Sequence, residues 1–134
     1  MSGTPAFAVT PRLERGVLSA ATTDWTGATT TNIVDVIIGA ATPGTKVDEL
    51  VVQADGNPAD SIVIIFVHNG TDYRPFDYFD LSDPAASSTT VPGFREARPY
   101  RNLLLPTASW KVAAAITVVP TSGNVVVWAL GANL

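Results

Sequence analysis

The only histidine, His68, is the first candidate for nucleophilic catalysis in this 134-residue chain. A Ser-His-Asp centre needs a nucleophile and an orienting acid around the imidazole, and no G-x-S-x-G motif accompanies His68. With one histidine and no cysteine, a zinc ion would take most of its ligands from carboxylates. We therefore expect a structural role for His68 at a strand end, and a protein that is not an enzyme, has no catalytic residue and binds no cofactor.

Four carboxylates, Asp72, Asp77, Asp80 and Asp83, gather around several aromatic residues, and oxygen ligands of this kind could hold Ca²⁺. Their spacing lacks the D-x-D-x-D-G order of a calcium loop, and on a strand Asp77 and Asp80 point to opposite faces. Asp72 and Asp83 belong to predicted turns, where aspartate is common. We expect solvated turn and edge carboxylates here, and no metal site.

Three of the eight basic residues, Arg95, Arg98 and Arg101, lie within seven positions. Guanidinium groups pair with carboxylates in a bidentate manner, stack on rings and are enriched at interfaces. In a chain of net charge −4, this cluster and Tyr100 are candidate contacts for a carboxylate-bearing partner. The alternative is a solvated connection between two strands.

The segment from Tyr73 to Phe79 concentrates aromatic and acidic residues. Aromatic rings stack on pyranose faces and carboxylates accept hydrogen bonds from sugar hydroxyls, so the segment could line a sugar site. Rings of this kind also fill the core of a sandwich or an intersubunit contact. A glycoside hydrolase would in addition need two carboxyl groups at a defined separation.

Composition limits the classes of partner. The net charge of −4 and a pI near 4.6 argue against a binder of phosphate backbones, and we expect no nucleic acid partner. No run of 18 apolar residues occurs, and Met1–Pro5 has neither a basic nor an apolar signal region, so we expect no membrane partner. Only 15% of residues are charged, against roughly 25% in typical domains. This low charge favours an oligomer or a larger assembly.

The clearest structural signal is the apolar run from Ile62 to Val67, followed by Asn69-Gly70 and a second strand-like run. Asn-Gly between two such runs predicts a β-hairpin with a type I′ turn, in which both central residues have positive φ. Because the first run lacks polar alternation, we expect this strand to be covered on both faces.

Roughly nine strand-like runs recur every 10 to 15 residues, and no segment shows helical periodicity between caps. They cover residues 17–20, 31–38, 46–54, 62–68, 73–81, 88–94, 100–105, 110–119 and 125–130. The spacing predicts an all-β fold, an antiparallel two-sheet β-sandwich of the jelly-roll type, with 81–92 as a crossing connection or an edge.

The first 15 residues carry Pro5 and Pro11 around the apolar patch that contains Phe7 and Val9. Proline cannot donate to a central strand ladder, so we predict an extended N-terminal arm at 1–15 and a single β-sandwich domain at 16–134. Phe7 and Val9 are candidate partner contacts.

The order of elements carries a resemblance. A strand at 47–54 leads to a turn with Gly56; then come the apolar strand and His68-Asn69-Gly70-Thr71, an aromatic and acidic strand at 76–81, and Leu103-Leu104-Leu105-Pro106 before Trp110-Lys111-Val112. Over residues 31–134 this order resembles small β-rich virion structural proteins of tailed bacteriophages, including those that decorate or cement the capsid.

The resemblance implies a non-enzymatic capsid decoration (cement) protein that binds and stabilises the assembled head. It implies the major capsid protein of the same phage as partner, self-association as a homotrimer, and a place on the outer capsid surface of the virion after synthesis in the host cytoplasm. The contact residues that fit this role are Phe7, Val9, Arg95, Arg98, Tyr100 and Arg101. The alternative is a tail or baseplate component that acts as a carbohydrate- or receptor-binding module, with Tyr73, Tyr78 or an exposed tryptophan as its stacking platform.

Overall fold

The computed structural model describes residues 10–134, which form eight strands and no helix. The strands are β1 (Thr10–Leu18), β2 (Val34–Ile38), β3 (Thr45–Ala54), β4 (Ser61–Asn69), β5 (Tyr73–Leu81), β6 (Arg95–Leu105), β7 (Trp110–Ile116) and β8 (Val125–Asn133). None of residues 10–134 forms a helix that is long and apolar enough to cross a membrane.

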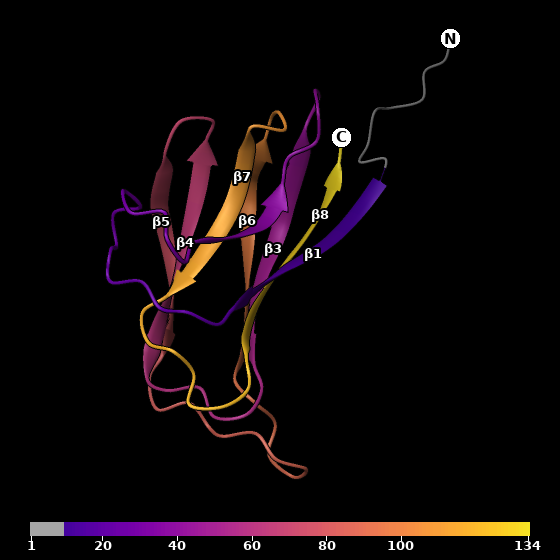
Figure 1. The fold of residues 1–134 in the computed structure, drawn as a ribbon. Helices are drawn as coiled ribbons and strands as arrows, with labels where there is room; N and C mark the ends of the chain where they lie inside the picture. Colours follow the sequence, from indigo (N-terminus) through magenta and orange to yellow (C-terminus); the bar gives the residue numbers. More distant parts are fainter. Residues whose placement is uncertain (1–9) are drawn as a thin grey trace.

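The strands form two four-stranded antiparallel sheets that face each other (Figure 1). The strand order is β1-β8-β3-β6 in one sheet and β2-β7-β4-β5 in the other, and every connection except the β4–β5 hairpin passes between the sheets. This is the order of an eight-stranded jelly roll. The predicted all-β sandwich is confirmed, and the segment after Leu81 is a crossing connection, as expected.

The core lies between the two sheets, because strand alternation turns every second side chain inward. Phe79 and Leu81 of β5 and Leu50 and Val52 of β3 belong to this layer, and all four are fully buried. A β-bulge between Val47 and Glu49 keeps the apolar side chains of β3 on the inner face along its length.

Strand β4 is covered on both faces, as its apolar run predicts. Val63 and Ile65 enter the core, while Ile64 and Phe66 form a second buried cluster on the outer side of the sheet. The cover on that side includes Ile33, from the connection between β1 and β2. The second layer is therefore a connection of the same chain, and not another sheet.

The β1–β2 connection extends past β7 and β4 toward β5 before it returns as β2 (Figure 1). Asp24 braces it, since its carboxylate accepts hydrogen bonds from the backbone N–H groups of Thr26 at 2.8 Å and Thr29 at 2.6 Å. The hydrogen bond from the Thr26 hydroxyl and these two backbone bonds lower the pKa of Asp24 to about 2. The ring of Trp25 packs on Tyr78 with centroids 5.3 Å apart, so the connection is held against the sheet.

The β4–β5 hairpin lies where the sequence predicts it, but its turn is different. Gly70 has a φ of +92°, whereas Asn69 does not have a positive φ, so the turn is not type I′. The Asn69 side-chain oxygen accepts hydrogen bonds from the backbone N–H groups of Thr71 and Asp72, which forms a longer loop. The type I′ prediction was wrong because an asparagine side chain can brace a wider turn by itself.

Two predicted strands differ from the structure. Residues 17–20 are not a separate strand, because β1 already extends through Leu18. Residues 88–94 are not a strand, because the Ser88 hydroxyl accepts hydrogen bonds from the backbone N–H groups of Thr90 and Val91 and closes a local turn. The described residues therefore contain eight strands where we predicted about nine.

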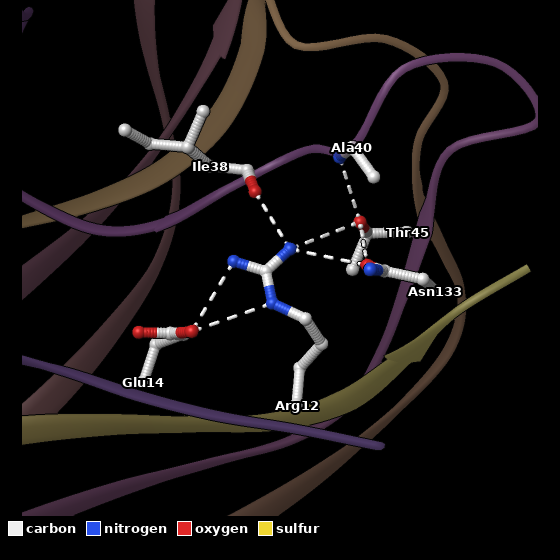
Figure 2. Close-up of polar contacts among 6 residues, drawn as sticks. All are labelled: Arg12, Glu14, Ile38, Ala40, Thr45 and Asn133. Atoms are coloured by element: carbon white, nitrogen blue, oxygen red, sulfur yellow. Dashed lines mark hydrogen bonds and ion pairs between the residues drawn. The ribbon is translucent and has the colours of Figure 1, made fainter. Parts of the chain in front are cut away.

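The segment predicted as an arm, 1–15, overlaps β1. Thr10 to Arg15 pair with β8, whereas Phe7 and Val9 lie outside the described residues. Figure 2 shows how Arg12 holds this part of β1. Its Nη1 donates to the backbone oxygen of Ile38 at 3.0 Å and to Asn133 Oδ1 at 3.1 Å, and its Nη2 contacts Glu14 at 3.3 Å. One side chain thus joins β1 to β2 and β8.

We predict that Arg12→Ala lowers the free energy of unfolding by about 1–3 kcal/mol, because it leaves Ile38 O and Asn133 Oδ1 without this donor. The midpoint of urea denaturation measures the change. The control is Arg74→Ala, since Arg74 is 68% exposed in its ion pair with Asp72 and its loss should cost less than about 1 kcal/mol. Equal midpoints for the two variants would contradict an anchoring role for Arg12.

Candidate partner-binding surface

Strand β8 contains six consecutive apolar residues, Val125 to Leu130. Val125, Val127 and Ala129 are fully buried in the core, so the alternate residues face the other way. The same unbroken pattern in β4 is covered by the β1–β2 connection, but on β8 the outward residues stay half-buried or exposed, with Leu130 at 37%. A strand that is apolar on both faces thus has one open face.

We call the side of the β1-β8-β3-β6 sheet that faces away from the core the outer sheet face. Strand register places its side chains in three rows across the four strands. The rows are Val17, Val126, Gln53 and Arg95; Arg15, Trp128, Val51 and Ala97; and Leu13, Leu130, Glu49 and Pro99. Apolar residues therefore occupy eight of the twelve positions, and charged or amide groups are spread among them.

The middle of the outer sheet face is hollowed. A hollow of about 260 Å³ is lined by Leu13, Glu49, Val51, Gln53, Arg95, Trp128 and Leu130. A second one of about 150 Å³ is lined by Arg15, Gln53, Asp55, Val126 and Trp128. Since both include Gln53 and Trp128, they adjoin, and the indole of Trp128 lies at the centre of a shallow groove with an apolar floor.

Arg15 and Arg95 of the outer sheet face, like Arg101, are not among the cations of residues 10–134 that form ion pairs. Five of the eight basic side chains form ion pairs within residues 10–134, and they are Arg12, Lys46, Arg74, Arg98 and Lys111. Arg15 and Arg95 form no ion pair with any described residue, and the Arg15 guanidinium lies 5.4 Å from the centroid of the Trp128 ring. This face of an acidic protein thus carries cations that have no carboxylate partner among the described residues.

The predicted contact residues on β6 separate onto two faces. Arg95 lies on the outer sheet face, and Arg101 is exposed. Arg98 and Tyr100 turn inward to Asp77 on β5: Arg98 Nη1 lies 2.7 Å from Asp77 Oδ1, and the Tyr100 hydroxyl donates to Asp77 Oδ2. These two side chains tie one sheet to the other and are engaged within the chain.

Burial and the hydrogen bond to Asp77 raise the pKa of Tyr100 above its usual value of 10. A group with a raised pKa in the folded state contributes stability that is complete below the unfolded pKa and is lost as the pH rises above it. We predict that the urea midpoint of the protein falls as the pH rises beyond about 10, and that Tyr100→Phe makes this fall shallower. Tyr78→Phe, at an exposed ring, is the control and should keep the wild-type slope. A Tyr100→Phe protein with the full alkaline decline would contradict the assignment.

The other candidate residues are dispersed or engaged locally. Asp72 pairs with Arg74, and Asp80 accepts a hydrogen bond from Ser82. His68 accepts a hydrogen bond from the backbone N–H of Gly70, and its ring packs edge-on against Tyr73. Within residues 10–134, no group of three or more histidine, aspartate and glutamate side chains is placed to hold a metal ion.

Arg15, Trp128, Leu13 and Leu130 were not among the residues selected from the sequence. The six consecutive apolar residues of β8 could have indicated the outer sheet face. Like the run in β4, they place apolar side chains on both sides of the strand. What the sequence could not show was that only one of these two strands is covered by its own chain.

Comparisons with known proteins assign this chain to no family. The sequence matches no protein-family model and no curated protein. Among solved structures, a chain of the structure described as "Cyanophage Pam1 capsid asymmetric unit" is similar, with a TM-score of 0.48 and 16% sequence identity, over 100% of this chain and 92% of that chain. A likeness at this level carries no conclusion about this chain.

Proposed function

We propose that the protein is a non-enzymatic virion structural protein of a tailed bacteriophage, and that it acts as a capsid decoration (cement) protein. The observation that carries the proposal is the open, apolar outer face of β8, which needs a cover that residues 10–134 do not supply. The order of strands and turns, which resembles small phage virion proteins, supports the proposal. The jelly-roll fold is compatible with this function, but it also occurs in lectins and enzymes, so the fold by itself does not distinguish these functions.

The proposed mechanism is adhesive. The rigid sandwich buries its outer sheet face on the shell, so that rupture of the shell must also break these contacts. A ligand that binds the assembled state alone stabilises that state by mass action, by about 2.7 kcal/mol per site when its concentration is 100 times Kd. No bond is made or broken, and the role requires no cofactor.

Phe7 and Val9 are a second proposed contact. The Arg12 anchor holds β1 up to Thr10, so the residues that precede it start from a defined point on the sandwich. Self-association as a homotrimer remains part of the proposal.

Localisation of the chain in an electron cryomicroscopy map of the intact particle tests the function. Density on the outer surface of the head, at local threefold or twofold positions, is the expected result. Density that is confined to the tail would overturn the decoration role.

A receptor- or carbohydrate-binding module at the tail is the second candidate, and exposed aromatic rings favour it. Trp25 is 40% exposed and Tyr78 is 50% exposed, and their rings are inclined at 50° to each other. A glycan array probed with the wild-type protein and with Tyr78→Ala distinguishes this candidate, since glycan binding that depends on Tyr78 would support it.

A further inference from the structure

The outer sheet face combines a tryptophan, two arginines and two leucines. Trp128 supplies a large ring at the centre, and Leu13 and Leu130 supply aliphatic area in one adjoining row. Arg15 lies in the row of Trp128, and Arg95 lies in the row on its other side. Tryptophan and arginine are enriched among interface hot spots, especially near the centre of a patch. The face therefore has the composition of a protein-binding surface.

The floor of the groove favours a protein over a sugar. Leu13, Val51 and Leu130 are aliphatic, so Trp128 is the one ring among the lining residues on which a pyranose could stack. Leu13 is also the most exposed large apolar side chain of this face, at 61%. Such a side chain is best buried in a complementary apolar surface.

The charges favour a partner other than a second copy. A two-fold, face-to-face pairing centred between β8 and β3 sets Arg15 opposite either Arg15 or Ala97, and Arg95 opposite either Pro99 or Val17. With the two-fold axis parallel or perpendicular to the strands, no carboxylate of the three rows lies opposite these cations, and Glu49 meets Leu130 or Gln53. Burial of unpaired guanidinium groups is costly, so these two symmetric pairings are disfavoured.

We propose that the outer sheet face docks onto an apolar ridge of the capsid protein that is flanked by carboxylates, with Arg15 and Arg95 pairing with those carboxylates around Trp128. This inference rests on the proposed function and names the surface and the partner chemistry. Glu49, the one acidic group in the three rows, pairs with a basic residue or a backbone donor of the same ridge. Arg15 is already placed beside Trp128, which reduces the ordering that binding requires.

Co-sedimentation of the full chain with capsid shells that lack it, assembled from the major capsid protein of the same phage, tests the inference. We expect wild-type affinity to fall with increasing salt, because the arginine–carboxylate pairs are screened. Arg95→Glu and Arg15→Glu should each weaken binding at least tenfold. The matched control is Arg74→Glu, an exposed arginine on the other sheet, which should change affinity less than twofold.

A second measurement, the fluorescence of Trp128, does not depend on how the arginine variants fold. In a chain with Trp25→Phe and Trp110→Phe, Trp128 is the only tryptophan, and its fluorescence should shift to the blue and resist acrylamide quenching when shells are added. If wild-type protein binds shells while the arginine variants bind equally well and Trp128 stays accessible, the inference is overturned and the proposed function stands. If the wild type does not bind shells, both are overturned. Self-association of the free protein that Arg95→Glu abolishes, or glycan binding that it abolishes, would also overturn the inference.

Discussion

Replacing Phe66 by alanine is expected to lower the free energy of unfolding by about 3–5 kcal/mol, although Phe66 lies on the outer side of its sheet. The side chain is fully buried and packs with Ile64 beneath the cover that includes Ile33. Its ring also meets Tyr73 edge-on at a centroid distance of 6.3 Å. Truncation removes the buried ring and leaves a cavity that the β1–β2 connection, braced by Asp24, cannot readily fill. Urea denaturation followed by circular dichroism measures the loss.

The matched control for this prediction is Phe76→Ala. Phe76 lies on β5 of the same sheet but is 41% exposed, so its loss should cost about half as much or less. If Phe66→Ala cost no more than Phe76→Ala, the outer cluster would not be a packed second core, and the explanation of the apolar run in β4 would fail.

The second large effect is expected for Gly131→Ala in β8. A Cβ atom at this position would lie 2.0 Å from the backbone oxygen of Lys46, in the bulged pairing of β3 with β8. Because the obstacle is backbone, the two central strands would have to separate there, and we expect a loss of about 3 kcal/mol or more, or failure to fold. Expression yield and the urea midpoint measure the outcome.

Gly70→Ala is the control that shows how much stability a glycine replacement costs through backbone conformation alone, without a close contact. Gly70 has a φ of +92°, but its added Cβ would meet nothing closer than 3.5 Å. We expect a cost of about 1–2 kcal/mol from backbone strain alone. A Gly70 variant that is less stable than the Gly131 variant would show that conformation outweighs the contact with Lys46.

The arginine cluster shows why candidate residues could be selected from the sequence but not assigned to a common surface. Arg95 and Arg98 are three positions apart, and in a strand of period two this odd spacing sends them to opposite faces. The alternative for this cluster was a solvated connection between two strands, whereas the structure places it on the edge strand β6, where Pro99 is tolerated. Arg98 therefore faces inward and pairs with Asp77, whereas Arg95 lies on the outer sheet face.

The sequence by itself determined the positions of most strands and turns, because alternation, β-branched residues and turn-forming residues act over a few neighbours. It also determined that two strands, β4 and β8, are apolar on both faces. Only the tertiary structure decided that the β1–β2 connection covers β4 and that the outer face of β8 is left open with Trp128, Arg15 and Arg95 upon it. The physical reason is that an apolar run shows only that both faces of a strand favour burial. Which segment or partner buries the second face depends on contacts between residues far apart in the chain.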